Sequence, residues 1–496
     1  MEQVIKRRIE KELEMHDPLS DKQYGFRQGK STIDAMMHVK KIAEDCRKKR
    51  KKCAILAVDV QNAFNSVPWK GIVEELEKKT PPYLVRTICS YFKNRVLKID
   101  ETCTMQLSSG IPQGSKLGPL LWNVYYDPVL RINMPEDTHL IAYADDLLIV
   151  VCDKSLQMLE EKSNVAISSV NDWIEQRGLT LAPHKTEVVV LSGRKSICNI
   201  QVMVKNTSIT AKSSTKYLGV IFDQNMRLTS HITYAVEKAE KVAAALGRLM
   251  PNIGGPGNGK RHILASVVYS TLFYGAPIWQ TALKWEKYRA MYEKVQRKMM
   301  LRIARAYRTT STVALQVISD SPPIELLVEE RCKKHLIGRT ETGEQQRLRE
   351  EVLEAWQIRW EQERGKGDWT RRLIKDVRTW STRKHGEVNH WLTQMLSGHG
   401  IFQQYKYRFK LCSSSQCFYC DGTDDVEHTF FICNRWDRQR LELNGKLNTT
   451  VNVENLVEIM LVNPASWGYV DKFVTSILKQ KQVDEQRLEP ERCRNN

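Results

Sequence analysis

The feature that most constrains this chain is a pair of adjacent aspartates, Asp145 and Asp146, that lies between two apolar runs. Residues 140–142 and 147–151 have the composition of β-strands, and the polar pair between them indicates the tight turn of a hairpin. Two unpaired carboxylates held at a rigid turn are costly to bury, so they need a cation. Mg²⁺ is the natural candidate because it takes oxygen ligands and shares them with substrate phosphates. Taken alone, the pair is also compatible with an ordinary surface hairpin.

Two stretches upstream support the metal-binding interpretation. Residues 54–58 form an apolar strand pattern that ends on Asp59. Residues 109–121 are rich in glycine and proline and lead into a helix pattern. A strand that ends on an acid, a Gly/Pro loop that opens a helix, and then an acidic hairpin follow one another in the order of a polymerase palm.

With these motifs in this order, the chain resembles the reverse transcriptases of non-LTR (LINE-type) retrotransposons, nearest to the site-specific insect-type elements. Further matching strings lie at residues 23–32, 178–187 and 217–220, the last of which corresponds to a hairpin that grips the primer end. The resemblance covers roughly residues 3–440. It implies an α+β fold: a right-hand polymerase of fingers, palm and thumb, followed by a helical region and a small Cys-Cys-His-Cys zinc knuckle. The expected domains are partial fingers and palm (1–225), a helical thumb (226–310), a helical connector (311–404), the zinc knuckle (405–440) and a C-terminal tail (441–496).

The resemblance also implies roles for individual palm residues. Asp59, Asp145 and Asp146 would hold two Mg²⁺ ions for nucleotidyl transfer, and the backbone carbonyl of Val60 would complete a metal site. Lys185 matches a lysine near the pyrophosphate that can act as a general acid. These residues form the expected catalytic group.

Four more positions match residues that contact the incoming nucleotide. Arg27 matches a fingers position that pairs with triphosphate oxygens, for which a guanidinium is suited. Gln113 and Gly114 match the loop that lines the incoming base and the template. Phe64 matches an aromatic ring beneath the sugar that blocks a 2′-hydroxyl and so favours deoxynucleotides. A core aromatic that packs behind the strand is the alternative for Phe64.

A second cluster lies near the C-terminus. Cys417, Cys420, His428 and Cys433 have the spacing of metal ligands, in which two cysteines form a knuckle turn and a histidine and a cysteine close a tetrahedron. A structural Zn²⁺ is the expected ion, with Cys412 as an alternate ligand; free thiols or a redox pair are the other reading. The aromatic residues of this segment, which could stack on bases or form its core, are Phe418, Tyr419, Phe430, Phe431 and Trp436.

Net charge points to the partner. The chain has 496 residues and a formal net charge of +18, which favours nucleic acid, although a merely soluble basic protein fits the charge as well. The expected partners are the element RNA template, a target DNA primer and deoxynucleoside triphosphates, without a membrane; the oligomeric state is open. We expect an intracellular, nuclear protein whose cysteines are mostly reduced thiols or metal ligands. The basic run at residues 47–52 is either a nuclear-localisation signal or a solvated loop.

Helical periodicity is expected over residues 31–45 and 155–177, and over three basic amphipathic stretches of the thumb that either contact phosphates or simply face solvent. Residues 324–396 are charge-rich and helical. Residues after about 480 are polar and are expected to fray. The tryptophans of the helical region are Trp356, Trp360, Trp369, Trp380 and Trp391.

Full-length members of the resembled family also carry an upstream endonuclease and longer N-terminal fingers. We therefore expect an N-terminally truncated polymerase without an endonuclease domain, with processive synthesis in doubt. Two functions stay open: an RNA-directed DNA polymerase that works by target-primed reverse transcription, and a catalytically inactive nucleic-acid-binding remnant of a truncated element copy. A domesticated, non-transposing reverse transcriptase is a third option.

Overall fold

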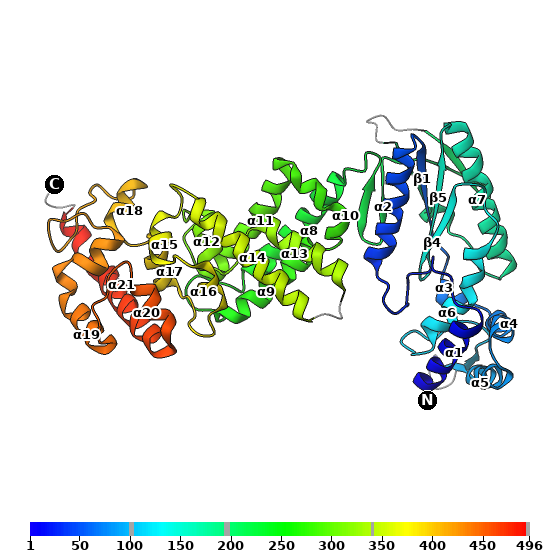
Figure 1. The fold of residues 1–496 in the computed structure, drawn as a ribbon, viewed down its shortest axis with the longest axis horizontal. Helices are drawn as coiled ribbons and strands as arrows, with labels where there is room; N and C mark the ends of the chain where they lie inside the picture. Colours follow the sequence, from blue (N-terminus) through cyan, green and yellow to red (C-terminus); the bar gives the residue numbers. More distant parts are fainter. Residues whose placement is uncertain (99–103, 193–198, 339–341, 493–496) are drawn as a thin grey trace. The chain divides into compact units, whose positions relative to one another are not determined.

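The computed structural model describes residues 1–98, 104–192, 199–338 and 342–492 (Figure 1). The chain divides into two compact units, each with its own core. Unit 1 comprises Met1–His231 and Pro277–Thr281, and unit 2 comprises Ile232–Ala276 and Ala282–Asn496. Strands gather in unit 1 and unit 2 is helical, so the α+β class predicted from the sequence is confirmed. The finer division into five domains stays a prediction.

Unit 1 is built on a four-stranded antiparallel sheet with the order β4–β5–β1–β6. The two central strands, β1 and β5, are buried along most of their length, which explains why their sequences are continuous apolar runs. Helix α2 packs on β1, β4 and β5, helix α7 packs on β1 and β5, and Figure 1 shows the two helices on opposite sides of the sheet. The bounds are β1 Lys52–Val58, β4 Thr138–Tyr143, β5 Asp146–Asp153, β6 Glu187–Leu191, α2 Thr32–Lys48 and α7 Leu156–Gln176.

Local signals fix both covering helices. Ser31 caps α2 through a capping box with Asp34: the Asp34 amide donates to Ser31 Oγ over 3.3 Å, and the Ser31 amide donates to Asp34 Oδ2 over 2.7 Å. Helix α7 is followed by Gly178, whose φ of +73° favours glycine. Both helices were predicted from periodicity and are confirmed.

The remaining described elements of unit 1 surround the sheet and supply three small two-stranded sheets. The helices are α1 Glu2–His16, α3 Ala63–Ser66, α4 Trp69–Lys79, α5 Pro82–Phe92, α6 Gly118–Tyr126, η1 Asp127–Arg131, η2 Pro183–Lys185 and α10 Ala276–Trp279, with η3 Gln280–Lys284 after α10. The further strands are β2 Val96–Lys98, β3 Thr104–Gln106, β7 Gln201–Val204, β8 Thr207–Thr210, β9 Ser214–Tyr217 and β10 Val220–Asp223.

Unit 2 contains a continuous hydrophobic core that reaches from Met300 to Leu478 and includes Cys417 and Cys433. The predicted knuckle segment therefore shares its core with the helices before and after it. The helices are α8 Thr229–Gly247, α9 Asn258–Leu272, α11 Glu286–Ala304, α12 Thr312–Ile318, α13 Ile324–Ile337, α14 Thr342–Gln362, α15 Asp368–Leu373, α16 Val377–Thr382, α17 His390–Ser397, α18 Gln403–Arg408, η4 His428–Ile432, η5 Asn434–Trp436, α19 Asp437–Leu447, α20 Leu456–Val462 and α21 Pro464–Arg492.

The expectation of a frayed C-terminus is wrong. Helix α21 runs to Arg492, and its polar residues are used for docking. Lys481 is 1% exposed and forms an ion pair with Asp424, which is fully buried. Glu485 accepts from the side-chain amide of Gln403 over 2.6 Å. Polarity misled the sequence argument because these charges find partners inside the fold.

Two cysteines of unit 1, Cys46 on α2 and Cys152 on β5, form a disulfide. The other cysteines in the described ranges form no disulfide, including Cys417, Cys420 and Cys433 of the predicted metal-binding set. Within those ranges, none of the helices is both long and apolar enough to cross a bilayer.

Candidate active site and metal cluster

The strand register brings the three predicted aspartates to one end of the sheet. Strands β1 and β5 pair up to Val58 opposite Leu147, so Asp59 emerges next to Asp146. Strands β4 and β5 pair Tyr143 with Asp146, which leaves Ala144 and Asp145 as the two-residue turn. Two local sequence patterns predicted the strand that ends on Asp59 and the acidic hairpin, but only strand pairing places Asp59 beside the hairpin.

Burial and neighbouring charge disfavour the ionised forms of Asp145 and Asp146. Burial is the main factor that raises the pKa of Asp146 to about 6, and the negative charges of Asp145 and Asp59 add to it. Burial also raises the pKa of Asp145, with a further contribution from Asp59 that Lys185 partly opposes. The ionised forms of Asp145 and Asp146 are therefore disfavoured by burial and by the neighbouring negative charge of Asp59.

Among the described residues, Lys185 contributes a positive charge beside the three aspartates through its ion pair with Asp59. Its Nζ lies 3.0 Å from Asp59 Oδ2, and its side chain is 70% exposed. One exposed ammonium leaves three carboxylates with an excess of negative charge. A divalent cation with oxygen ligands fits that excess, so the donor set is suited to Mg²⁺.

Residues 180–182 hold the end of β1 in place. The Gln61 amide donates to Thr180 O over 2.8 Å, and the Ala182 amide donates to Asp59 O over 2.9 Å. These two bonds form the bridge between Val60 and Leu181 without using the Val60 carbonyl. The segment leads directly into η2, which carries Lys185.

A clamp from the N-terminal segment fixes the acidic turn. Ala144 has a φ of +58°, in the left-handed region that a residue with a side chain adopts only under constraint. Gln23, 2% exposed, supplies the constraint: its Oε1 accepts from the Ala144 amide at 3.1 Å and its Nε2 donates to Ala144 O at 3.2 Å. The sequence argument used the string around Gln23 but assigned no role to this residue. A glutamine two residues before a glycine was the available signal.

Gly25 completes the clamp by close approach, and its replacement tests the arrangement. A Cβ at this position would lie 2.1 Å from the Ala144 amide nitrogen and 2.9 Å from the Tyr143 carbonyl carbon. Because these are backbone atoms, no rotamer change relieves the clash. We expect Gly25→Ala to lower the free energy of unfolding by about 1–3 kcal/mol, as overpacking does. It should also lower any metal-dependent activity about a hundredfold, since misplacement of a reacting group by about 1 Å has that effect.

Urea unfolding and activity should be measured together on this variant. Gly259→Ala is the matched control, because a Cβ there meets no atom within 4 Å. Unchanged stability and activity in Gly25→Ala would show that the turn does not depend on this contact.

The predicted nucleotide-contact residues lie in different surroundings. Phe64 is half-buried between Trp122, at a ring distance of 4.9 Å, and Phe26, at 6.0 Å. Gln113 and Gly114 are exposed in the loop before α6. An added Cβ at Gly114 would meet nothing within 4 Å, so this loop leaves open space beside its backbone.

Arg27 is engaged elsewhere. Its guanidinium donates to the backbone carbonyls of Leu19, at 3.2 Å, and Ser20, at 3.1 Å. The structure therefore shows Arg27 holding the segment that precedes it, and its contact with a triphosphate stays a prediction.

The hairpin of β9 and β10 also approaches the acidic group. Tyr217 pairs with Val220 across a two-residue turn, in which Leu218 and Gly219 have φ values of +44° and +87°. Burial raises the pKa of Tyr217, and the charge of Asp146 raises it further. The hairpin predicted to grip the primer thus lies within electrostatic range of the carboxylates.

The four residues predicted to bind zinc meet in unit 2. One ligand atom from each of Cys417, Cys420, His428 and Cys433 lies within 4.8 Å of the others. The Sγ atoms of Cys417 and Cys433 are 3.9 Å apart, and Cys420 Sγ lies 3.2 Å from His428 Nε2. Burial, as the main cause, raises the pKa of the Cys433 thiol to about 12. Such a thiol ionises only beside a cation, so the donor set fits a metal ion.

Cys412 lies outside this group. Its Sγ contacts the carbonyls of Ser414, at 3.1 Å, and Gln403, at 3.5 Å. The aromatic residues near the cluster are mainly core: Phe430 is fully buried and Trp436 is 1% exposed. The Tyr419 hydroxyl donates to Asp484 of α21 over 2.7 Å. Base stacking, if unit 2 performs it, needs other rings.

Residues 1–222 match the family model described as reverse transcriptase (RNA-dependent DNA polymerase). The chain is 27% identical over 433 residues to a putative 115 kDa protein in the type-1 retrotransposable element R1DM of Drosophila melanogaster, covering 83% of this chain and 42% of that protein. It is 25% identical over 467 residues to a retrovirus-related Pol polyprotein from the R1 element of Bradysia coprophila, covering 90% of this chain and 46% of that protein.

A third relative is the RNA-directed DNA polymerase from the mobile element jockey of Drosophila melanogaster, 24% identical over 273 residues, which covers 53% of this chain and 30% of that protein. The chain thus spans less than half the length of these curated relatives. Among solved structures, a Candida tropicalis telomerase in complex with a fragment of telomeric RNA aligns with a TM-score of 0.36 and 10% identity over 71% of this chain and 56% of that one.

Proposed function

We propose that this chain is an RNA-directed DNA polymerase that extends a DNA primer on an RNA template, because residues 1–222 match the reverse transcriptase family and the chain is similar to proteins of the R1 retrotransposable element and the mobile element jockey. The observation that carries the proposal is the convergence of Asp59, Asp145 and Asp146 at one end of the sheet. In the element, the primer would be nicked target DNA and the template the element's own RNA, which places the reaction in the nucleus.

Asp59, Asp145 and Asp146 would hold two Mg²⁺ ions, with the Val60 carbonyl as a further oxygen ligand. When bound, these ions lower the pKa of the primer 3′-hydroxyl and neutralise charge on the departing pyrophosphate. The chain's own task is positioning. The Gln23 clamp orients Asp145, the bridge to residues 180–182 orients Asp59, and Lys185 supplies a positive charge beside the carboxylates, where it can give a proton to the pyrophosphate.

The proposal is tested by primer extension on poly(rA)/oligo(dT) with Mg²⁺ and dTTP. We expect labelled products that lengthen with time and disappear when EDTA replaces Mg²⁺. A folded, nucleic-acid-binding chain that extends no primer on RNA or DNA templates would instead establish the inactive-remnant alternative.

Phe64 provides a test of sugar selection. We expect Phe64→Val to raise ribonucleotide incorporation relative to deoxynucleotide incorporation about tenfold or more, because removal of the ring opens space for a 2′-hydroxyl. Single-nucleotide extension with dTTP and UTP measures the ratio. The control is Phe92→Leu, since Phe92 is a 3% exposed core ring stacked on Trp69. If both variants lose stability but neither changes the ratio, Phe64 is a core residue only.

We further propose that Cys417, Cys420, His428 and Cys433 hold one structural Zn²⁺. Four protein ligands leave no open position, so this ion would organise the fold and take no part in the reaction. The cluster joins η4 to the knuckle turn, in which the Cys417 amide donates to Gly422 O over 2.8 Å. Its binding free energy would be part of the folding free energy of unit 2.

A further inference from the structure

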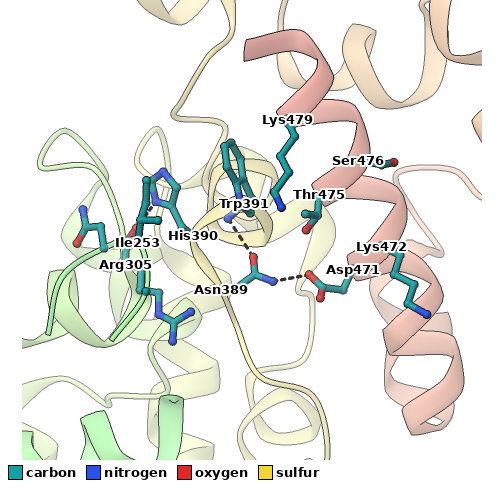
Figure 2. Close-up of a pocket in the computed structure, with 12 residues that line it drawn as sticks. Ile253, Arg305, Asn389, His390, Trp391, Asp471, Lys472, Thr475, Ser476 and Lys479 are labelled. Carbon is teal, nitrogen blue, oxygen red and sulfur yellow. Dashed lines mark hydrogen bonds between the residues drawn. The ribbon is translucent and has the colours of Figure 1, made fainter. Parts of the chain in front are cut away.

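Unit 2 contains a cavity that the proposed polymerase site does not use. It has a volume of about 550 Å³, within the range of ligand-binding sites. Its walls come from the loop after α8, the end of α11, the start of α17 and one face of α21 (Figure 2). All of these segments belong to unit 2.

Hydrogen bonds fix the cavity walls before any ligand arrives. Asn389 caps α17 by accepting from the amides of Trp391, at 3.0 Å, and Leu392, at 2.9 Å. Its side-chain nitrogen donates to Asp471 of α21 over 2.6 Å, and His390 Nδ1 lies 3.0 Å from the carbonyl oxygen of Arg305. The three elements therefore hold one another in a defined arrangement, which favours binding because little order must be created.

The cavity is basic. Arg305, Lys472 and Lys479 line it together with a single acid, Asp471. In Figure 2 the Lys479 side chain extends from α21 toward the Trp391 ring. The Arg305 guanidinium donates to Pro256 O over 3.0 Å, while its buried Nε has no hydrogen-bond partner among the described residues. A basic lining suits an anionic ligand.

Trp391 is the first ring of an aromatic track that leads away from the cavity. Each ring of the track contacts the next one. The centroid distances are 5.5 Å between Trp391 and His390 and 5.6 Å between His390 and Tyr307. They are 6.1 Å between Tyr307 and Tyr405 and 4.9 Å between Tyr405 and Phe409. None of these five rings is fully buried, and Phe409 is 39% exposed. Three exposed basic residues accompany the track: Arg308, Arg408 and Lys410.

We propose that unit 2 binds single-stranded nucleic acid along this track, with one nucleobase in the cavity against Trp391 and the adjoining phosphates at Arg305 and Lys479. Partly exposed rings offer stacking faces to unpaired bases of any sequence, and basic side chains beside them follow the backbone. A duplex keeps its bases stacked on one another and cannot use the rings in this way. The site is an addition to the proposed polymerase, because every residue that forms it lies in unit 2.

The test measures the binding of oligo(U) and oligo(dT), each of about 12 nucleotides, to the full chain by fluorescence anisotropy, with a blunt duplex as the comparison ligand. We expect Trp391→Ala to weaken single-strand binding about tenfold, within the range of one lost stacking contact. Trp391→Phe should retain most of the affinity, and Lys479→Gln should lower the dependence of affinity on salt. Duplex affinity should stay unchanged. Equal affinities for oligo(U) and oligo(dT) are expected, and a loss confined to one of them would identify RNA or DNA as the occupant.

Two controls separate this site from general effects. Trp285→Ala removes a 45% exposed tryptophan of unit 2 away from the track, and Lys384→Gln removes an exposed charge that does not line the cavity. Both should bind single strands like the unchanged chain. Equal losses in the control and track variants would reject the track.

Photo-crosslinking locates the contact directly and distinguishes this proposal from the polymerase proposal. With 5-iodouracil in the single strand, crosslinked peptides should contain Trp391 or the Tyr405–Phe409 segment. Crosslinks confined to peptides of unit 1 would overturn the track even if primers are extended. Crosslinks to unit 2 in a chain that extends no primer would support the track while rejecting the polymerase.

Discussion

Asp145→Asn is expected to abolish primer extension while leaving the chain folded. The substitution keeps the volume of the side chain but removes a charge that a metal-bound transition state requires. A loss of about a thousandfold or more is expected, which corresponds to roughly 4 kcal/mol of transition-state stabilisation. Extension rates at saturating template–primer and dTTP provide the measurement.

Although Asp145→Asn should lose activity, its folded state should be as stable as that of the unchanged chain or more stable. Burial raises the pKa of Asp145, so above that pKa the ionised carboxylate disfavours the folded state. Without Mg²⁺, the asparagine variant should therefore melt at the same temperature as the unchanged chain or higher. Mg²⁺ should raise the melting temperature of the unchanged chain more than that of the variant, because only the former has the full ligand set.

Asp153→Asn is the matched control for this prediction. Asp153 lies at the other end of the same strand, where it forms an ion pair with Lys162 at 2.8 Å. Its replacement should leave extension intact. An active Asp145→Asn chain, or equal losses in both variants, would reject the acidic turn as the catalytic centre.

Loss of the metal cluster should have the largest effect on stability. We expect Cys433→Ser to release zinc and to lower the free energy of unfolding of unit 2 by roughly 4 kcal/mol or more, as loss of a structural metal does. The physical reason is that Cys417 and Cys433 are 3% and 1% exposed within the continuous core of unit 2. Without the ion, their polar sulfur atoms and the His428 ring lose their common partner inside that core.

Zinc content and the melting temperature of the full chain measure this effect together. Replacement of zinc by Co²⁺ should add the absorption bands of a tetrahedral thiolate site in the unchanged chain and not in Cys433→Ser. Cys412→Ser is the control, because its thiol contacts backbone carbonyls outside the four-ligand group. If Cys412→Ser loses the ion and Cys433→Ser keeps it, the ligand assignment is wrong.

Much of the fold could be predicted because its signals are local. The capping box at Ser31, the apolar runs of β1 and β5 and the glycine after α7 each depend on neighbouring residues, and the predicted elements formed there. The C-terminal end of α21 could not be predicted in this way. Their charge alone predicts that Lys481 and Glu485 face solvent. In the structure Lys481 pairs with Asp424 and Glu485 accepts a hydrogen bond from Gln403, and both partners are distant in sequence.

The tryptophans of unit 2 show the same limit. Trp356, Trp360 and Trp380 are core residues, whereas Trp391 is only partly buried against that core and lines a basic cavity. Periodicity cannot separate these cases because all four rings lie in helical, charge-rich sequence. His390 and Tyr405 likewise lack any spacing that would connect them, and they join one track only through Tyr307.

By itself, the sequence predicted which residues would carry chemistry: acids at the ends of strands and a Cys-Cys-His-Cys set with ligand spacing, in a chain whose residues 1–222 match the reverse transcriptase family. Residue type and short spacing can be seen in the sequence directly, without knowledge of the fold. The tertiary structure alone decided which of these groups meet. Strand register set Asp59 beside Asp146, and the approach of Gln23 and Gly25 to Ala144 fixed the acidic turn. Such contacts join residues 87 to 121 positions apart, where pairing and packing, rather than local pattern, select the neighbour.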